Sequence, residues 1–198
     1  MRRQSRARPR SGRRAGSVRV SGGLWKGRWI EVGAVARPTS ARAREALFDL
    51  LGPRLLGARF LDLYAGSGAV GLEALSRGAS RVVLVERDSS ALTRNVARLG
   101  PPEGSVEVLP LETSEAIRRL KRLPERFEIA FADPPYAATG AAELLGRVAT
   151  MLSPRGTFVL QCDEDVEAAR TVGGLALRDR RAYGRNVLLF YEESNPSF

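Results

Sequence analysis

Apolar and polar positions along the chain form blocks that suit strands and helices in alternation. Five short apolar runs have the composition of buried strands, at 59–64, 81–86, 105–109, 127–132 and 156–161. Segments with helix-forming composition lie before and between them, and after the last, at 40–51, 69–77, 90–99, 113–122, 140–151 and 164–171. This alternation predicts an α/β fold with a mostly parallel, seven-stranded sheet and helices on both faces.

The two ends of the chain predict further strands. A small N-terminal β element is expected over about 18–38, and 174–192 is typical of two strands around the turn Tyr183-Gly-Arg-Asn186. A length of 198 residues supports one sizeable core, and the sequence has neither an internal repeat nor a linker to a second domain. We therefore expect one domain over 18–198 that includes the β extension.

A glycine-rich turn, Asp62-Leu-Tyr-Ala-Gly-Ser-Gly68, ends the first apolar run. Glycines let the backbone approach a ligand closely, and the helix that follows offers unpaired N–H groups at its start. The next strand ends at Glu86, whose carboxylate can accept hydrogen bonds from ribose hydroxyls. We expect a cofactor site here, formed by Asp62, Ala65, Gly66, Ser67, Gly68 and Glu86.

Two cofactors fit this turn, and a purely structural turn is a third interpretation. Residues 66–71 satisfy Gly-x-Gly-x-x-Gly, the dinucleotide-binding fingerprint. Asp62 favours S-adenosylmethionine instead. Its carboxylate occupies a position where a nicotinamide-type fold would want an apolar residue, and it can attract the cationic methionine end of the cofactor. A strand, turn and helix without a ligand is the remaining alternative.

The sequence Asp133-Pro-Pro-Tyr136 follows the apolar run 127–132, so it lies at the edge where open α/β sheets bind ligands. Prolines fix φ and carry no N–H, and the stiff turn aims their carbonyls. The Asp133 carboxylate and the Pro134 carbonyl are suitably spaced acceptors for an exocyclic amine, and Tyr136 offers a face for a base that has left its stack. With Pro135, these residues form the candidate catalytic site. A capped turn without chemistry is the alternative.

Together the two motifs resemble those of the amino-methyltransferases that use S-adenosylmethionine. The finer resemblance is to the bacterial RsmD family, the guanine-N2 methyltransferases of small-subunit (16S) ribosomal RNA, and it extends over about 16–192. It rests on Val18-Arg-Val-Ser-Gly-Gly-Leu-Trp-Lys-Gly-Arg28, Arg37-Pro-Thr-Ser-Ala-Arg-Ala-Arg-Glu45 and Leu61 to Arg77. It implies a Rossmann-like methyltransferase fold, S-adenosylmethionine as cofactor, and ribosomal RNA or a small-subunit assembly particle as partner.

The resemblance also implies roles for individual residues. It places the stretch from Arg37 to Glu45 against the cofactor and the active site, and it gives the target amine to the turn from Asp133 to Tyr136. Near the adenine, relatives often carry Asn or Asp, where this chain has Glu112. The residues implied at the cofactor are Thr39, Asp62, Ala65, Gly66, Ser67, Gly68, Glu86, Arg87, Glu112, Thr113 and Asp133.

Two other classes of function stay open. A methyltransferase acting on DNA adenine-N6 or protein glutamine-N5 would also present an amine to a turn of Asp or Asn, two prolines and an aromatic residue. A non-catalytic RNA-binding module can retain the same fold. The match from Arg37 to Glu45 and the basic N-terminus favour an RNA methyltransferase.

The formal net charge of +10 is concentrated at the N-terminus. Residues 1–17 carry seven arginines, no acid and no apolar periodicity, so we expect a disordered arm that neutralises RNA phosphates. A solvated tail is the alternative, since arginine outnumbers lysine thirty to two, a bias typical of high-GC genomes. Trp25 and Trp29 can stack on bases or pack against the domain. The candidate RNA contacts are Arg10, Arg13, Arg14, Lys26, Arg28, Arg37 and Arg42.

Missing residue types exclude several kinds of chemistry. Histidine is absent and Cys162 is the one cysteine, which excludes an intrachain disulfide, Ser-His-Asp and Cys-His catalysis, and the usual zinc clusters. Methyl transfer tolerates this loss, because positioning does most of the work, and we expect no metal. No apolar stretch is long enough for a membrane span and no signal-peptide core follows the basic start, so we expect a cytoplasmic monomer.

Overall fold

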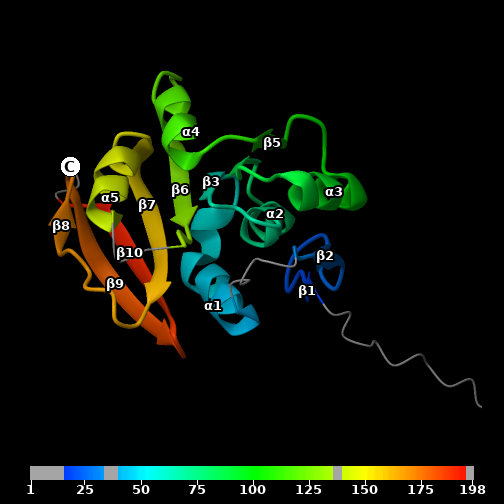
Figure 1. The fold of residues 1–198 in the computed structure, drawn as a ribbon, viewed down its shortest axis with the longest axis horizontal. Coiled ribbons are helices and arrows are strands. Elements are labelled where there is room, and N and C mark those ends of the chain that lie inside the picture. Colours follow the sequence, from blue (N-terminus) through cyan, green and yellow to red (C-terminus); the bar gives the residue numbers. More distant parts are fainter. Residues whose placement is uncertain (1–15, 34–39, 136–139, 195–198) are drawn as a thin grey trace, which may run out of the picture.

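The computed structural model describes residues 16–33, 40–135 and 140–194. Within these residues, the centre is an eight-stranded sheet with the order β5-β4-β3-β6-β7-β10-β9-β8 (Figure 1). Five neighbouring strands run parallel: β5 (Val106–Leu109), β4 (Arg81–Val85), β3 (Arg59–Leu63), β6 (Phe127–Ala132) and β7 (Leu152–Asp163). Three more pair antiparallel: β10 (Asn186–Glu193), β9 (Leu175–Tyr183) and β8 (Thr171–Val172). The prediction of an α/β fold with a mostly parallel sheet is confirmed.

Two details of the predicted secondary structure are wrong. The sheet of the described residues has eight strands instead of seven, and the segment 164–171 forms no helix. Gly173 and Gly174 have positive φ angles of 60° and 83° and reverse the chain, so that Thr171–Val172 pairs with the start of β9 as an edge strand. This two-glycine turn outweighs the modest helical composition of the residues before it.

Helices cover both faces of the sheet, as predicted. One face carries α1 (Ala41–Leu51), with a 3-10 helix over Gly52–Leu55 after it, α2 (Ala69–Ser76) and α3 (Ser90–Leu99); the other carries α4 (Thr113–Leu120) and α5 (Ala141–Ala149). Successive side chains of β3 alternate between the faces. Phe60 belongs to the first core, and Leu61 and Leu63 to the second. No described helix has both the length and the apolar character needed to cross a membrane.

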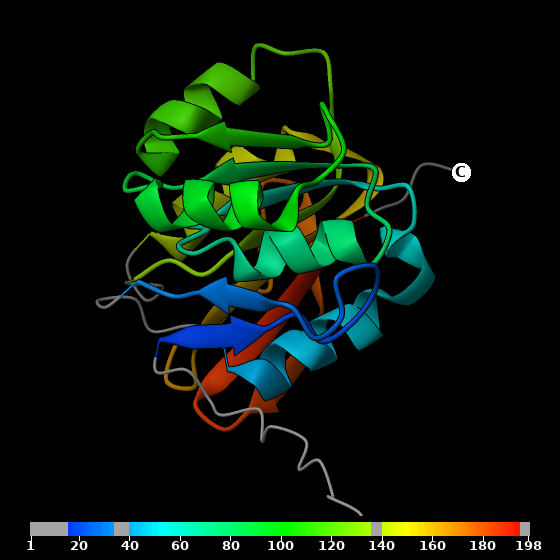
Figure 2. The ribbon, with the colours of Figure 1, turned by 90° about the vertical axis from the view of Figure 1, so that its right-hand side faces the viewer.

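A small antiparallel sheet, β1 (Ser17–Arg19) and β2 (Trp29–Glu31), precedes the main one. Figure 2 shows it in blue beneath the green helices α2 and α3. Trp25, in the connection between its strands, is 5% exposed and packs in the core that these helices share. Of the two interpretations, stacking on bases or packing against the domain, packing is confirmed for Trp25. Trp29 is half-buried, with the Arg19 guanidinium 4.8 Å from its ring centre.

Candidate cofactor and substrate site

The carboxyl ends of β3 and β6 bring the two sequence motifs together. These strands are neighbours in the parallel sheet, and Leu63 pairs with Ala132 in their register. The glycine turn begins directly after Leu63, and Asp133 directly after Ala132. Both motifs therefore lie at the edge of the sheet where open α/β folds bind ligands.

The glycine turn adopts backbone conformations that only glycine takes up easily. Gly66 and Gly68 have φ angles of 55° and 79°, in the left-handed region. A Cβ on Gly68 would lie 2.4 Å from Cδ1 of Leu92 in α3, whereas a Cβ on Gly66 would meet no described atom within 4 Å. Packing thus requires glycine at position 68, while position 66 faces open space in which a ligand can approach the backbone.

Glu86, which follows β4, holds this turn from the neighbouring strand. Its Oε2 accepts a hydrogen bond of 2.9 Å from the Gly66 N–H, and its Oε1 accepts one of 3.2 Å from the Asp88 N–H. The side chain is half-buried, and each carboxylate oxygen has a second lone pair. The carboxylate can therefore fix the turn and still accept hydrogen bonds from a ligand.

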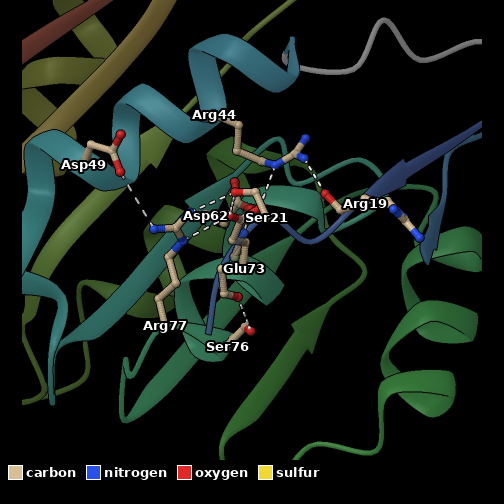
Figure 3. A network of polar contacts seen from close by, with 10 residues as sticks. Arg19, Ser21, Arg44, Asp49, Asp62, Glu73, Ser76 and Arg77 are labelled. Carbon is tan, nitrogen blue, oxygen red and sulfur yellow. Dashed lines mark hydrogen bonds and ion pairs between the residues drawn. The ribbon is translucent and has the colours of Figure 1, made fainter. Parts of the chain in front are cut away.

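Asp62 contacts α2 from the neighbouring strand β3, and Figure 3 shows it close to Glu73 of that helix. It is 1% exposed, its Oδ2 accepts a hydrogen bond of 2.8 Å from the Gly71 N–H, and its Oδ1 has no hydrogen-bond partner among the described residues. Burial raises the pKa of Asp62 to about 8; the Gly71 N–H opposes this shift, and the charges of Asp133 and Glu86 add to it. The contact that the structure gives Asp62 is thus with the first turn of α2.

Asp133 is oriented by a residue that the sequence analysis missed. Its Oδ2 accepts a hydrogen bond of 2.7 Å from Nε2 of Gln161 in β7. Gln161 is 3% exposed, and its Nε2 lies 3.5 Å from Oδ1 of Asn186 at the start of β10. The available signal in the sequence was a polar amide at the end of an apolar run. Its place beside Asp133 follows from the pairing of β7 with β6.

A cavity of about 250 Å³ opens beside the Asp133 turn. Tyr64 and Pro134 line it together with the start of α4, including Thr113, and the start of α5. Tyr64 has a φ angle of 63°, which is costly for a bulky residue and is found at functional sites. The sequence analysis placed Tyr64 inside the glycine motif without giving it a role.

Comparison with known proteins establishes the family. Residues 18–192 match the family described as Conserved hypothetical protein 95. The chain belongs to this family. The putative rRNA methyltransferase YlbH of Bacillus subtilis is 33% identical over 182 residues, which cover 89% of this chain and 99% of that protein. Ribosomal RNA small subunit methyltransferase D of Haemophilus influenzae is 31% identical over 157 residues, 76% of this chain and 81% of that protein.

A solved structure agrees with this membership. The putative methyltransferase yhhF from Escherichia coli is 32% identical, with a TM-score of 0.77, and the match covers 90% of this chain and 98% of that one. The resemblance to the RsmD family is therefore confirmed, and so is the methyltransferase fold that it implied.

Three of the cofactor residues expected for the family lie at the ends of β4 and β5. Arg87 follows Glu86, and its Nη1 lies 2.9 Å from Oε1 of Glu112. Thr113 is 6% exposed and begins α4. The ion pair itself is exposed on both sides, so it contributes little to stability. A cofactor-binding role for these three residues stays a prediction, and so does the place of Glu112 near the adenine.

The candidate RNA contacts are only partly within the described residues. Lys26 is exposed in the N-terminal element, and Arg42 is exposed in the first turn of α1. Arg28 has a partner that the sequence did not reveal: its guanidinium donates to the carbonyl oxygens of Arg98 and Leu99, at 2.8 and 3.1 Å, and so caps α3. Several expected site residues lie outside the described residues: Arg10, Arg13, Arg14, Arg37, Thr39 and Tyr136.

The described residues contain no group of three or more histidine, cysteine, aspartate or glutamate side chains placed to hold a metal ion. Cys162 is buried, and burial raises the pKa of its thiol to about 11. Its thiol is therefore protonated at neutral pH.

Proposed function

We propose that this protein transfers a methyl group from S-adenosylmethionine to the exocyclic N2 amine of a guanine in small-subunit ribosomal RNA. Ribosomal RNA methylation rests on the family and on the names of its members in Bacillus and Haemophilus. The observation that carries the chemistry is the pairing of Leu63 with Ala132, which sets the Asp133 carboxylate beside the glycine turn. The choice of guanine and of N2 rests on the resemblance to the RsmD family.

The residues of the glycine turn fit S-adenosylmethionine. Position 66 leaves room for a ligand against the backbone, and Glu86 stands at the end of the next strand with spare acceptor capacity for two ribose hydroxyls. S-adenosylmethionine supplies a methyl group on a positively charged sulfur. Asp62 and Glu86 put carboxylates on this side of the site, although the raised pKa of Asp62 means that its charge depends on pH.

The turn after β6 is proposed to hold the amine. Asp133 can accept one N–H of the amine while Gln161 keeps the carboxylate in place. The Pro134 carbonyl of the same turn can accept the other. Two fixed acceptors orient the nitrogen lone pair toward the glycine turn, and such positioning can lower the barrier by about 7 kcal/mol or more at the upper end. Tyr136 would stack on the extruded base.

Basic residues around the carboxyl ends of the parallel strands would bind the RNA. Arg42 at the start of α1, Lys26, Arg37 and the arginines of the N-terminal arm are proposed to contact phosphates, which position the RNA without reading its sequence. The predicted disordered arm over residues 1–17 and domain over 18–198 stay part of the proposal, although Ser17 itself is the first residue of β1. So do a monomeric state, a cytoplasmic location, and either free ribosomal RNA or an assembly particle as the substrate.

Mass spectrometry of ribosomal RNA nucleosides, with and without the gene, tests this function. We expect N2-methylguanosine in 16S RNA to fall when the gene is deleted, and purified protein with S-adenosylmethionine to restore it in vitro. Unchanged ribosomal nucleosides would refute RNA methylation. Restoration of N6-methyladenine in DNA or of methylated glutamine in protein would establish one of the other amino-methyltransferase activities.

A further inference from the structure

A single buried side chain joins the N-terminal β element to the glycine turn. Asn95 of α3 is 0% exposed. Its Oδ1 accepts a hydrogen bond of 2.9 Å from the Glu31 N–H, and its Nδ2 donates to the Glu31 carbonyl at 2.8 Å and to the Ser67 carbonyl at 3.0 Å. Both donors of the amide are used, and each satisfies a backbone group of a different segment.

The geometry of Asn95 suits this bridging role. Toward Glu31, the last residue of β2, the amide offers one acceptor and one donor, as a neighbouring strand would. Toward Ser67, it fixes the carbonyl between Gly66 and Gly68, the two left-handed glycines of the turn. Buried amides that satisfy all their partners hold one geometry, because any shift leaves a polar group unpaired in a low-dielectric interior.

The rest of the interface joins the β element to the body of α2. Figure 3 shows Glu73 of α2 at the centre of a buried cluster. Its Oε2 pairs with Nε of Arg44 in α1 at 2.8 Å, and its Oε1 accepts from the hydroxyl of Ser21 and, at 3.0 Å, from Nε of Arg77. The β element thus contacts the body of α2 through this cluster and the turn before α2 through Asn95.

We propose that Asn95 is a positioning residue that couples RNA binding to cofactor binding. The N-terminal β element carries Lys26 and leads into the segment that contains Arg37, both assigned to RNA under the proposed function, on which this inference rests. A ligand that fixes the position of β2 also fixes the Ser67 carbonyl, and a cofactor that fixes the glycine turn also fixes Glu31. Coupling of this kind is reciprocal, so each ligand strengthens the binding of the other by the same factor.

The variant Asn95→Asp tests the three hydrogen bonds of Asn95, here called the joint, with almost no change in side-chain shape. It replaces the two donors of Nδ2 by a carboxylate oxygen that faces the carbonyls of Glu31 and Ser67. We expect the dissociation constant of S-adenosylhomocysteine, measured by calorimetry without RNA, to rise about tenfold or more. The matched control is Arg94→Gln in the same helix, because Arg94 forms an exposed ion pair with the Glu31 side chain and makes none of the three hydrogen bonds of the joint.

Coupling is measured as the ratio of the dissociation constant of S-adenosylhomocysteine without RNA to that with RNA. The dissociation constant of S-adenosylhomocysteine is determined with and without purified 16S ribosomal RNA from cells that lack the gene. We expect RNA to tighten binding about fivefold or more in the wild type and in Arg94→Gln, and to have no effect in Asn95→Asp. Loss of stability alone would not change this ratio, since it is taken on folded protein at a temperature well below the unfolding transition.

Three outcomes would overturn the inference: a wild-type dissociation constant in Asn95→Asp, a ratio of one in the wild type, or an unchanged ratio in the variant. If the variant does not fold, hydrogen exchange of the wild type decides. S-adenosylhomocysteine should slow exchange of the Glu31 amide, but not of the Gly27 amide, which donates to Val20 within the β element; equal effects would refute the joint. The measurements without RNA stand even if ribosomal RNA proves not to be the substrate.

Discussion

The two turns that meet at the sheet edge are built in opposite ways. The turn after β3 is held by two side chains from other segments, Glu86 on the Gly66 N–H and Asn95 on the Ser67 carbonyl. Asp62 holds the first turn of the helix that follows, through the Gly71 N–H. The turn after β6 is stiffened by two prolines that carry no N–H, and Gln161 reaches its carboxylate from β7.

The difference suggests that the glycine turn is preorganised for its ligand and that the proline turn recognises a substrate group. The glycine turn uses its neighbours to fix a backbone surface before any ligand binds, which suits a cofactor of constant shape. The proline turn presents acceptors at the edge of the cavity, which suits a substrate group that arrives with N–H donors. We therefore expect substitutions near the first turn to change cofactor affinity, and substitutions near the second to change the rate of the chemical step.

The largest effect is expected for Asp133→Ala. If this carboxylate orients the amine in the transition state, kcat should fall about 100-fold or more, while cofactor affinity stays nearly intact. Steady-state kinetics on RNA and calorimetry with S-adenosylmethionine check the two halves. Asp165→Ala is the control, because Asp165 is an exposed carboxylate in the connection after β7. A wild-type kcat for Asp133→Ala would remove Asp133 from the mechanism.

Cofactor affinity should respond next most strongly, to Glu86→Ala. Losing charge-assisted hydrogen bonds to the ribose costs about 1.5–3 kcal/mol, which raises the dissociation constant of S-adenosylmethionine about tenfold or more. The Gly66 N–H also loses its acceptor. The control is Glu107→Gln. Glu107 of β5 pairs with Arg81 at the start of β4, whereas Glu86 follows the end of β4. Equal affinities for wild type and Glu86→Ala would place the ribose elsewhere.

Deletion of residues 1–15 should weaken RNA binding and leave cofactor binding unchanged. The plot of log K for RNA against log salt should become shallower, by about 0.7–0.9 for each phosphate contact that is lost. The identity of the modified base and the affinity for S-adenosylmethionine should not change, because phosphate contacts position the RNA while base contacts specify it. Identical slopes for the two proteins would show that the arm is a solvated tail.

The smallest effect on the reaction is expected at Asp62, where stability depends on pH. The folded-state pKa of about 8 lies above the ordinary value of 3.8. The stabilising effect of the bound proton is therefore complete below about pH 4 and is lost as the pH rises through 8. Relative to Asp62→Asn, the wild type should lose at most about 1.4 kcal/mol of unfolding free energy per pH unit between these values. Urea unfolding at pH 5.5 and pH 8.5 measures this difference; parallel pH profiles would argue against the shift.

The sequence predicted elements whose signals are local. Apolar runs ending in turn residues located the parallel strands, and the glycines at 66 and 68 predicted the turn before α2. The failure at 164–171 has a local cause as well: Gly173 and Gly174 form a tight turn that creates β8, and helical composition over a few residues is too weak to prevail against it.

The residues that support the site were hidden from sequence analysis because their partners are distant in the chain. Asn95 is one polar residue in an amphipathic helix, and Arg28 is one of many arginines. Gln161 lies near the end of an apolar strand, without any motif around it. Each has a function only because the fold brings it to a backbone group or a carboxylate from another segment.

The sequence by itself determined which chemical groups the protein carries and in what order, and hence its fold class, its candidate cofactor turn and its candidate amine-binding turn. Tertiary structure alone decided that β3 and β6 are neighbours, that Asp62 is buried against α2, and that Asn95 links the N-terminal element to the glycine turn. The physical reason is that turns and strands depend on short-range backbone preferences. Strand order, burial and hydrogen bonds between distant segments depend instead on how the whole chain packs.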